Sequence, residues 1–282
     1  MSSPHPANDK PMLSQLSGTI VLVGAGKMGG ALLDGWLALG LDPKNIVVLE
    51  PQPAREIASL AARGVRLNPK AASVDAAAIV VAVKPQIAPE ALPPLAPSVA
   101  ASTVVVSIMA GRRLAFLEQA LGARAALVRA MPNTPAAIGR GITVAVANAR
   151  VSGRQRELVH ALLSAVGAVE WIADEALMDA VTAVSGSGPA YVFLLAEALA
   201  QAGTAAGLPA DLAAKLARET VAGAGELLHR SPLDAATLRQ NVTSPGGTTA
   251  AALEVLGGPD GLARLLQQAV AAATRRSREL AD

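Results

Sequence analysis

The chain has 282 residues, of which 52% are hydrophobic but only 2% aromatic, and its formal net charge at pH 7 is +2. This length suggests two domains or one large one, with a substantial core that Ala, Val and Leu must build in place of aromatic rings. The absence of cysteine excludes disulfides, cysteine-ligated metals and thiol catalysis, and the small charge excess gives no signal of a nucleic-acid partner.

The amino-terminal residues 1–17, MSSPHPANDKPMLSQLS, contain no apolar signal core and indicate a loose tail. An uncharged, largely apolar run at residues 180–196 contains Gly-Ser-Gly-Pro and falls short of a membrane span. Together with the missing cysteines, these features favour a cytoplasmic protein with no membrane partner.

Residues 18–170 alternate short runs rich in Val and Ile with helical stretches. The expected strands cover residues 19–23, 46–49, 78–83, 103–108, 125–129 and 142–147. A helix follows the first strand and continues through Leu39, where Gly40 can end it in a left-handed conformation. Parallel neighbours need crossover connections, so this alternation predicts a Rossmann domain with a doubly wound, mostly parallel sheet.

The character of the chain changes near Asp174, where Ala/Leu stretches replace the Val and Ile runs. Apolar residues at helical spacing predict helices over residues 191–202, 210–228 and 262–280, and Asp260 is a plausible cap for the last. Residues 171–282 are therefore expected to form an all-helical second domain.

Gly24, Gly26 and Gly29 satisfy the G-x-G-x-x-G pattern between the first strand and the first helix. In this context the pattern predicts dinucleotide binding, with glycines for the tight turn, for approach of the pyrophosphate and for close helix–strand packing. Glu50, at the end of the second strand, is placed to bind the adenosine ribose 2′-hydroxyl, which favours NADH. Lys27 and Arg55 offer the opposite charge, so we expect some use of both NADH and NADPH.

The sequence offers poor candidates for acid–base catalysis and no expected metal site. His5 lies in the expected tail, and His160 and His229 lie in Ala/Leu helices. A reductase without an obvious proton donor suggests a substrate that arrives already activated, for example a protonated imine, for which positioning is the main requirement.

Several phrases stand where doubly wound sheets bind ligands or where long helices begin. They are AVKP at residues 82–85, SIMAG at 107–111, VRAMPNTP at 128–135, SGSGPAY at 185–191 and NVTSPGGTT at 241–249. Together they resemble the pyrroline-5-carboxylate reductase family over roughly residues 18–280. The resemblance implies reduction of 1-pyrroline-5-carboxylate to L-proline by NADPH or NADH. It also implies that the helical domain is a dimerisation domain, with homodimers as the minimum unit and decamers as a common assembly.

The resemblance also assigns residues to the cofactor. It implies that the pyrophosphate loop consists of Gly24, Ala25, Gly26, Lys27, Met28 and Gly29, and that Ala82, Val83, Lys84 and Pro85 lie beside the cofactor. Ala110 is expected near the nicotinamide end, and Asn241 is expected to contact the cofactor through the helical domain.

For the substrate, the resemblance implies that the carboxylate lies on the SPGGTT turn. Ser244 and the backbone N–H groups of Gly247 and Thr248 would bind it, and the Thr249 hydroxyl would lie near the ring nitrogen. Thr249 is then the candidate catalytic residue, either as proton donor or as hydrogen-bonding partner only. Glu175 resembles an acidic residue that lies near bound substrate.

The sequence departs from the family pattern at two places, and three alternative functions stay open. Gln201 stands where many relatives carry Asp, and the Glu50-Pro51 strand end differs from relatives with a polar or basic residue there. The alternatives are a reductase of another cyclic imine, a hydroxyacid dehydrogenase and a non-catalytic dinucleotide-binding regulatory protein. A hydroxyacid dehydrogenase would want a lysine in the first long helix, and none stands between Gly188 and Gly203.

Overall fold

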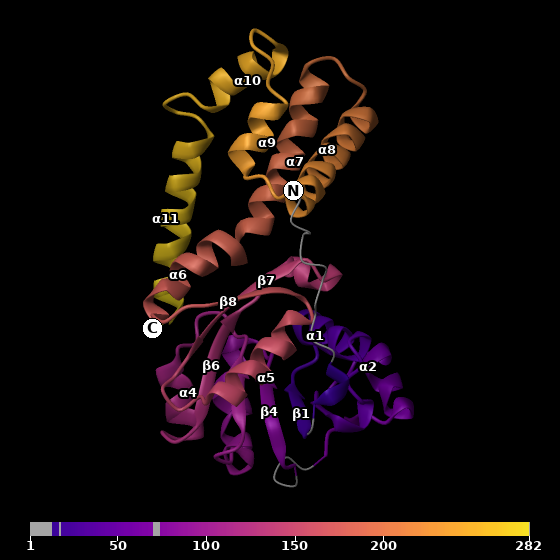
Figure 1. Ribbon diagram of the computed structural model, residues 1–282, viewed down its shortest axis with the longest axis vertical. Coiled ribbons are helices and arrows are strands. Elements are labelled where there is room, and N and C mark those ends of the chain that lie inside the picture. The colour runs from indigo at the N-terminus through magenta and orange to yellow at the C-terminus, as the bar shows by residue number, and fades with distance from the viewer. Residues whose placement is uncertain (1–12, 17, 70–73, 282) are drawn as a thin grey trace, which may run out of the picture. The chain divides into compact units, whose positions relative to one another are not determined.

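The computed structural model describes residues 13–16, 18–69 and 74–281 (Figure 1). They form two compact units: a sheet unit, which contains the described residues up to Gly186 and again from Thr274, and a helical unit, which contains residues 187–273. The division comes later than the boundary expected at residues 170–171, because the last strand ends only at Trp171 and Asp179 bonds to the final helix. Of the expected tail, residues 1–12 and 17 lie outside the described residues. Leu13 is buried, so the expectation of a loose tail is wrong there.

The sheet unit contains one sheet with the strand order β3-β2-β1-β4-β5-β6-β7-β8. Its strands are β1 (Thr19–Val23), β2 (Ile46–Leu49), β3 (Arg66–Leu67), β4 (Ala76–Val81), β5 (Val104–Ser107), β6 (Ala126–Met131), β7 (Gly141–Ala147) and β8 (Gly167–Trp171). All neighbours are parallel except β6 and β7. The doubly wound, mostly parallel sheet is therefore confirmed, with β3 and β8 as strands that the sequence pattern did not predict.

Helices cover both faces of this sheet. The helices of the sheet unit are α1 (Lys27–Ala38), α2 (Arg55–Ser59), α3 (Ala88–Ala91), α4 (Leu114–Leu121), α5 (Gly153–Ser164) and α6 (Met178–Val181). Alternate residues of each strand face opposite sides, so Leu22 joins the core under α1, α2 and α5, whereas Val23 joins the core under α3 and α4. Trp36 is fully buried in the first core, where its indole N–H donates to the Leu162 carbonyl at 2.9 Å.

The helical unit is built from α7 (Gly188–Ala205), α8 (Ala210–Arg230), α9 (Ala235–Asn241), α10 (Thr248–Leu256) and most of α11 (Leu262–Ala281), whose last turns belong to the sheet unit. The expected helices are confirmed, but Asp260 pairs with Arg264 and the first N–H bond of α11 goes to the Gly261 carbonyl.

Large apolar side chains remain exposed along the helical unit. Phe193 is 67% exposed, Leu194 63% and Val255 76%. By length and composition the helical stretch 175–205 could cross a membrane, and only 6% of its most apolar window is buried. This finding differs from the expectation based on the shorter uncharged run at residues 180–196. An apolar surface of this kind needs a cover, either a partner or a lipid phase.

Candidate functional site

The glycine loop between β1 and α1 has the geometry that its sequence pattern predicts. Gly24 has a φ of +89°, and a Cβ added there would lie 2.9 Å from the Ala82 carbonyl oxygen. A Cβ added at Gly29 would collide with the Gly24 carbonyl oxygen. A Cβ added at Gly26 would meet no described atom within 4 Å. Gly24 therefore permits the turn, Gly29 permits close packing, and Gly26 leaves the backbone open to a ligand.

The amino terminus of α1 has backbone donors with no acceptor inside the helix. The first N–H bond within the helix runs from Gly30 to the Gly26 carbonyl at 2.7 Å. The N–H groups of the preceding residues, including Lys27, have no partner within a helix of standard geometry. Because the helix dipole also favours negative charge here, this end of the 12-residue helix can hold a phosphate group.

Glu50 lies against the same loop. Its Oε2 accepts a hydrogen bond from the Ala25 N–H at 3.0 Å, and its Oε1 accepts one from the Gln52 N–H at 3.2 Å. Asn68 holds the Glu50 backbone through two further bonds of 2.8 and 2.9 Å. Sequence reasoning missed Asn68, whose φ of +47° is a conformation that Asn tolerates better than most residues. The carboxylate is thus fixed at the strand end where a ribose is expected.

Two further loops, which follow β4 and β5, lie beside the glycine loop. The Ala82 N–H donates to the Val23 carbonyl at 2.7 Å, which ties the loop after β4 to the end of β1. Pro85 lies on that loop, and its carbonyl accepts two bonds from the Arg112 guanidinium, at 3.0 and 3.2 Å. Ala110 is exposed on the loop after β5. The strand order reverses between β1 and β4, so these loops surround the switch point at which open α/β sheets bind ligands.

The SPGGTT phrase forms a turn followed by a helix within the helical unit. The Gly247 N–H donates to the Ser244 carbonyl at 3.1 Å, with Pro245 second in the turn and Gly246 third at a φ of +68°. These are the features of a type II turn, which requires a positive φ at its third residue. The turn ends at Gly247, which precedes the nine-residue α10.

This geometry changes one expected contact. The Gly247 N–H, which was expected to bind the substrate carboxylate, is already bonded within the turn. The first bond within α10 runs from Ala251 to the Gly247 carbonyl at 3.2 Å. The N–H groups of Thr248 and Thr249 precede it in the first helical turn, where they have no intrahelical acceptor. The donors that this turn can offer to a ligand are therefore the N–H groups of Thr248 and Thr249, one residue later than expected. Asn241 is the last residue of α9 and is exposed.

Glu175 has contacts that the sequence did not reveal. Its Oε1 accepts hydrogen bonds from the Leu114 N–H and from Arg129 Nη1, both at 2.9 Å. The Arg129 side chain is 5% exposed and the Glu175 side chain 26%. Arg129 was missed, although it is the only charged residue in the apolar run of β6. The structure thus places the Glu175 carboxylate against groups of its own unit, and its expected contact with substrate stays a prediction.

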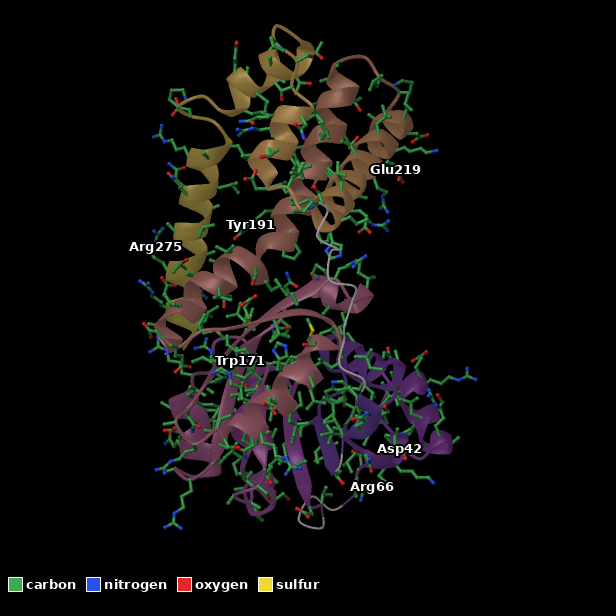
Figure 2. The ribbon with its side chains drawn as sticks, viewed as in Figure 1. Asp42, Arg66, Trp171, Tyr191, Glu219 and Arg275 are labelled. Atoms are coloured by element: carbon green, nitrogen blue, oxygen red, sulfur yellow. The ribbon has the colours of Figure 1, made fainter. Side chains whose placement is uncertain are left out.

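His160 on α5 makes a contact within its own unit. Its Nδ1 accepts a hydrogen bond from the indole N–H of Trp171, which is labelled in Figure 2, at 3.3 Å. The Arg156 guanidinium lies 4.4 Å from the centre of the Trp171 ring. Among the described residues, no group of three or more His, Cys, Asp or Glu side chains could hold a metal ion.

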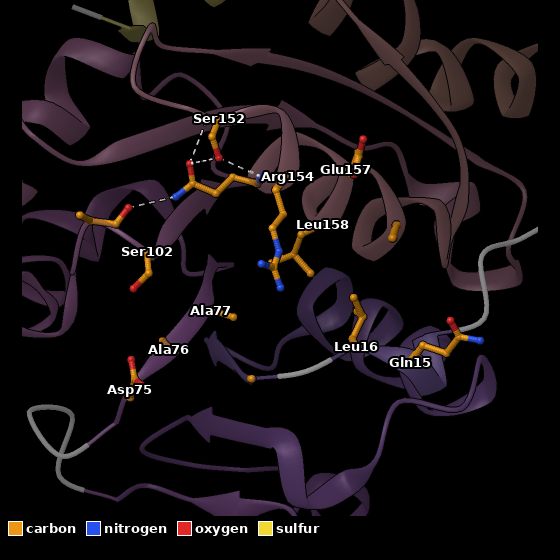
Figure 3. A pocket seen from close by; sticks show the side chains of 14 residues that line it. Gln15, Leu16, Asp75, Ala76, Ala77, Ser102, Ser152, Arg154, Glu157 and Leu158 are labelled. Carbon is orange, nitrogen blue, oxygen red and sulfur yellow. Dashed lines mark hydrogen bonds between the residues drawn. The ribbon is translucent and has the colours of Figure 1, made fainter.

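A hollow of about 680 Å³ lies elsewhere in the sheet unit (Figure 3). Its walls include Gly18, Asp75 and Ser102, which precede β1, β4 and β5. It therefore opens at the amino ends of these strands, whereas the glycine loop and its neighbours lie at the carboxyl ends. The hollow is separate from the expected cofactor site.

Two family models match different parts of the chain. Residues 175–280 match the family model for pyrroline-5-carboxylate reductase dimerisation, and residues 19–111 match the family model named NADP oxidoreductase coenzyme F420-dependent. A pyrroline-5-carboxylate reductase of Pseudomonas aeruginosa is 42% identical, over 93% of this chain and 97% of that protein. The chain belongs to the pyrroline-5-carboxylate reductase family. A Mycobacterium leprae member is also 42% identical, over 95% of this chain and 98% of its own.

Solved structures of the family share the fold. The structure of a pyrroline-5-carboxylate reductase from Coxiella burnetii superimposes with a TM-score of 0.88 at 33% identity, covering 95% of this chain and all of that one. The enzyme from Plasmodium falciparum, solved with NADP bound, gives a TM-score of 0.78 at 29% identity and covers 94% of this chain and 99% of its own. The family resemblance and the fold class predicted from the sequence are both confirmed.

Proposed function

We propose that this protein is a pyrroline-5-carboxylate reductase, which reduces 1-pyrroline-5-carboxylate to L-proline with NADPH or NADH. The observation that carries this proposal is the 42% identity to named members over almost the whole of both chains. The geometry of the glycine loop and of the SPGGTT turn supports it, since each presents the donors that its expected ligand requires.

The sheet unit would hold the cofactor at the carboxyl ends of its strands. In this proposal the pyrophosphate lies on the loop from Gly24 to Gly29, and Glu50 accepts a hydrogen bond from the adenosine ribose. The loop from Ala82 to Pro85 and Ala110 line the nicotinamide side, and Asn241 is a further proposed cofactor contact. When bound, the reduced nicotinamide supplies the hydride.

The helical unit would hold the substrate at the start of α10. The carboxylate of the substrate accepts hydrogen bonds from the Thr248 and Thr249 N–H groups and from the Ser244 hydroxyl. These bonds together fix the orientation of the substrate ring. Neutral donors also place no competing cation beside the ring nitrogen. The Thr249 hydroxyl supports that nitrogen, as proton donor or as hydrogen-bonding partner. Because the C=N bond can be protonated before it is reduced, the site needs no histidine.

A second copy of the chain would cover the apolar surface of the helical unit. The family model matched by residues 175–280 is a dimerisation domain, and these residues include Phe193, Leu194 and Val255. Pairing buries such side chains away from water, as obligate homodimers do. We therefore propose a cytoplasmic homodimer at least, with a decamer as the larger assembly, in place of insertion into a membrane.

One assay tests the proposed function. Purified protein is mixed with 1-pyrroline-5-carboxylate and either NADH or NADPH, and the absorbance of the reduced cofactor is followed while proline is quantified. We expect proline to form in step with cofactor oxidation. Cofactor binding without turnover would favour the regulatory protein, and turnover only when an oxo acid or another cyclic imine replaces 1-pyrroline-5-carboxylate would favour those enzymes. Either result would end the proposal.

A further inference from the structure

The loop between β5 and α4, residues 108–113, is tied to the loop after β4. The Ile108 N–H donates to the Val81 carbonyl at 3.0 Å as the loop leaves β5. Further along, the Arg112 guanidinium donates to the Pro85 carbonyl and lies 4.6 Å from the centre of the Phe116 ring. The two loops that carry Pro85 and Ala110 are thus joined at the carboxyl ends of the strands, where the cofactor is proposed to bind.

The far end of the 108–113 loop is fixed by one carboxylate oxygen. Glu175 Oε1 accepts from the Leu114 N–H, the first donor of α4, and from the guanidinium of Arg129 on β6. Arg129 is held in the middle of the sheet by its pairing with Ser107 on one side and Val146 on the other. We call this arrangement the Glu175–Arg129 clamp, because it joins the rigid sheet to the point where the loop ends.

The middle of the loop lies close to the end of the last helix. Gly111 has a φ of +75°, and a Cβ added there would lie 3.2 Å from the Leu280 carbonyl oxygen in α11. This end of α11 is itself anchored, since the buried Ser277 hydroxyl donates to Asp179 Oδ1 at 2.7 Å. The start and the end of the loop are fixed by hydrogen bonds and its middle packs close to α11, so the exposed Ala110 is the part that can meet a ligand.

We propose that Glu175 and Arg129 are positioning residues that hold the 108–113 loop against the nicotinamide end of the cofactor. This inference rests on the proposed function. Arg129 is a buried cation, and such a charge needs a paired and well-oriented acceptor. The carboxylate that supplies the acceptor also fixes the first N–H of α4, so a change in the pair is transmitted to the loop. Hydride transfer depends on placement, and a displacement of about 1 Å can lower a rate by about 100-fold.

This role differs from a direct contact between Glu175 and the substrate, which the family resemblance implies. A clamp acts on the nicotinamide half of the cofactor and leaves the adenosine half and the substrate carboxylate unaffected. A direct contact instead acts on the KM for substrate and does not depend on Arg129. The clamp therefore predicts weaker binding of the nicotinamide cofactor, whereas direct contact predicts a higher KM for the substrate.

The test compares two ligands that differ only at the nicotinamide end. Dissociation constants for NADH and for ADP-ribose, which lacks the nicotinamide, are measured with the full-length protein and with Glu175→Ala, which removes the acceptor of both hydrogen bonds. The double variant Glu175→Ala/Arg129→Met removes both charges, so it leaves no buried cation unpaired if the single variant folds poorly. Glu118→Gln is the matched control, because Glu118 also lies on α4 and Gln can still accept from Asn148.

We expect the single and double variants to raise the Kd for NADH about tenfold and to lower kcat by about 10- to 100-fold. The Kd for ADP-ribose and the KM for 1-pyrroline-5-carboxylate should match those of the wild type, as should every constant of Glu118→Gln. An equal loss of affinity for NADH and ADP-ribose, or no loss of affinity for either, would refute the proposed clamp. A rise confined to the substrate KM would instead establish direct contact.

A measurement on the wild-type protein covers the case in which both variants fail to fold. The clamp requires the Leu114 amide to be protected from hydrogen exchange, whereas fast exchange at that amide would refute it. If the wild type binds both ligands but forms no proline, the proposed function fails while the binding comparison still decides the clamp.

Discussion

The two glycines at 24 and 26 have separable roles, which a pair of alanine variants can resolve. Gly24→Ala places a methyl group 2.9 Å from the Ala82 carbonyl oxygen in a residue whose φ is +89°. A left-handed conformation costs a non-glycine residue about 1–2 kcal/mol, and a forced contact in a packed region costs about 1–3 kcal/mol. We therefore expect Gly24→Ala to lower the free energy of unfolding by about 2–5 kcal/mol, a large share of the stability of a typical domain.

Gly26→Ala should behave in the opposite way. No described atom lies within 4 Å of the added methyl group, and the Gly26 φ of −70° suits alanine. Its effect on folding should be below about 1 kcal/mol, because a weaker helix cap and a stiffer unfolded chain oppose each other. The methyl group would stand where the pyrophosphate approaches the backbone. Loss of one hydrogen bond to a charged group, about 1.5–3 kcal/mol, corresponds to a Kd for NADH raised about 10- to 150-fold.

Both quantities are measured on the same preparations. Denaturant unfolding at a fixed protein concentration gives the stability, since an oligomer's stability depends on concentration. Fluorescence of the reduced cofactor gives the Kd. If Gly26→Ala unfolded as readily as Gly24→Ala, or bound NADH like the wild type, the assignment of an open phosphate approach at Gly26 would be wrong.

The remaining predictions concern the cofactor, the substrate and one helix. Glu50→Gln should raise the ratio of kcat/KM for NADPH to that for NADH about tenfold, by removing a carboxylate that repels a 2′-phosphate; an unchanged ratio would show that this charge does not set the preference. Thr249→Ala and Ser244→Ala should lower proline formation and leave the Kd for NADH unchanged, and parallel loss of cofactor binding would contradict a substrate role. The pKa of the Asp234 carboxyl is lowered because it accepts hydrogen bonds from the Thr237 N–H and hydroxyl at the start of α9. The stability it gives is present above the ordinary Asp pKa and is lost as the pH falls through the lowered value. An NMR titration in which the Asp234 pKa is not lowered would refute this.

The parts of the fold that the sequence predicted are those with strong local signals. The continuous apolar run at residues 19–23 and the glycines after it define β1 and the start of α1 without reference to distant residues. β8 was missed because Gly-Ala-Val-Glu-Trp includes a charged residue and two small ones, and it is a strand only through its pairing with β7. The division between the units was misplaced for a similar reason, since Asp179 and Ser277 are 98 residues apart.

The candidate site shows the same dependence on distance in the chain. The role of the glycines follows from their spacing, whereas the contacts of Glu175 join residues 61 and 46 positions away. The bond from Gly247 to Ser244 is a different case, because a Pro second and a Gly third in the turn are local signals of a type II turn. That turn leaves the N–H groups of Thr248 and Thr249 as the first donors of α10 without an acceptor inside the helix, a result obtainable from the phrase alone.

A buried ion pair within an apolar sheet needs an explanation other than stability. Apolar side chains of similar volume often stabilise a core as well as or better than a buried pair, because removing two charges from water offsets much of their attraction. Arg129 lies in a strand whose other residues are apolar, and a Leu or Met there would serve the core at least equally well. What those side chains could not do is orient Glu175 so that one oxygen meets both the guanidinium and the first N–H of α4. The pair is thus better explained by the placement of the 108–113 loop than by the stability of the sheet.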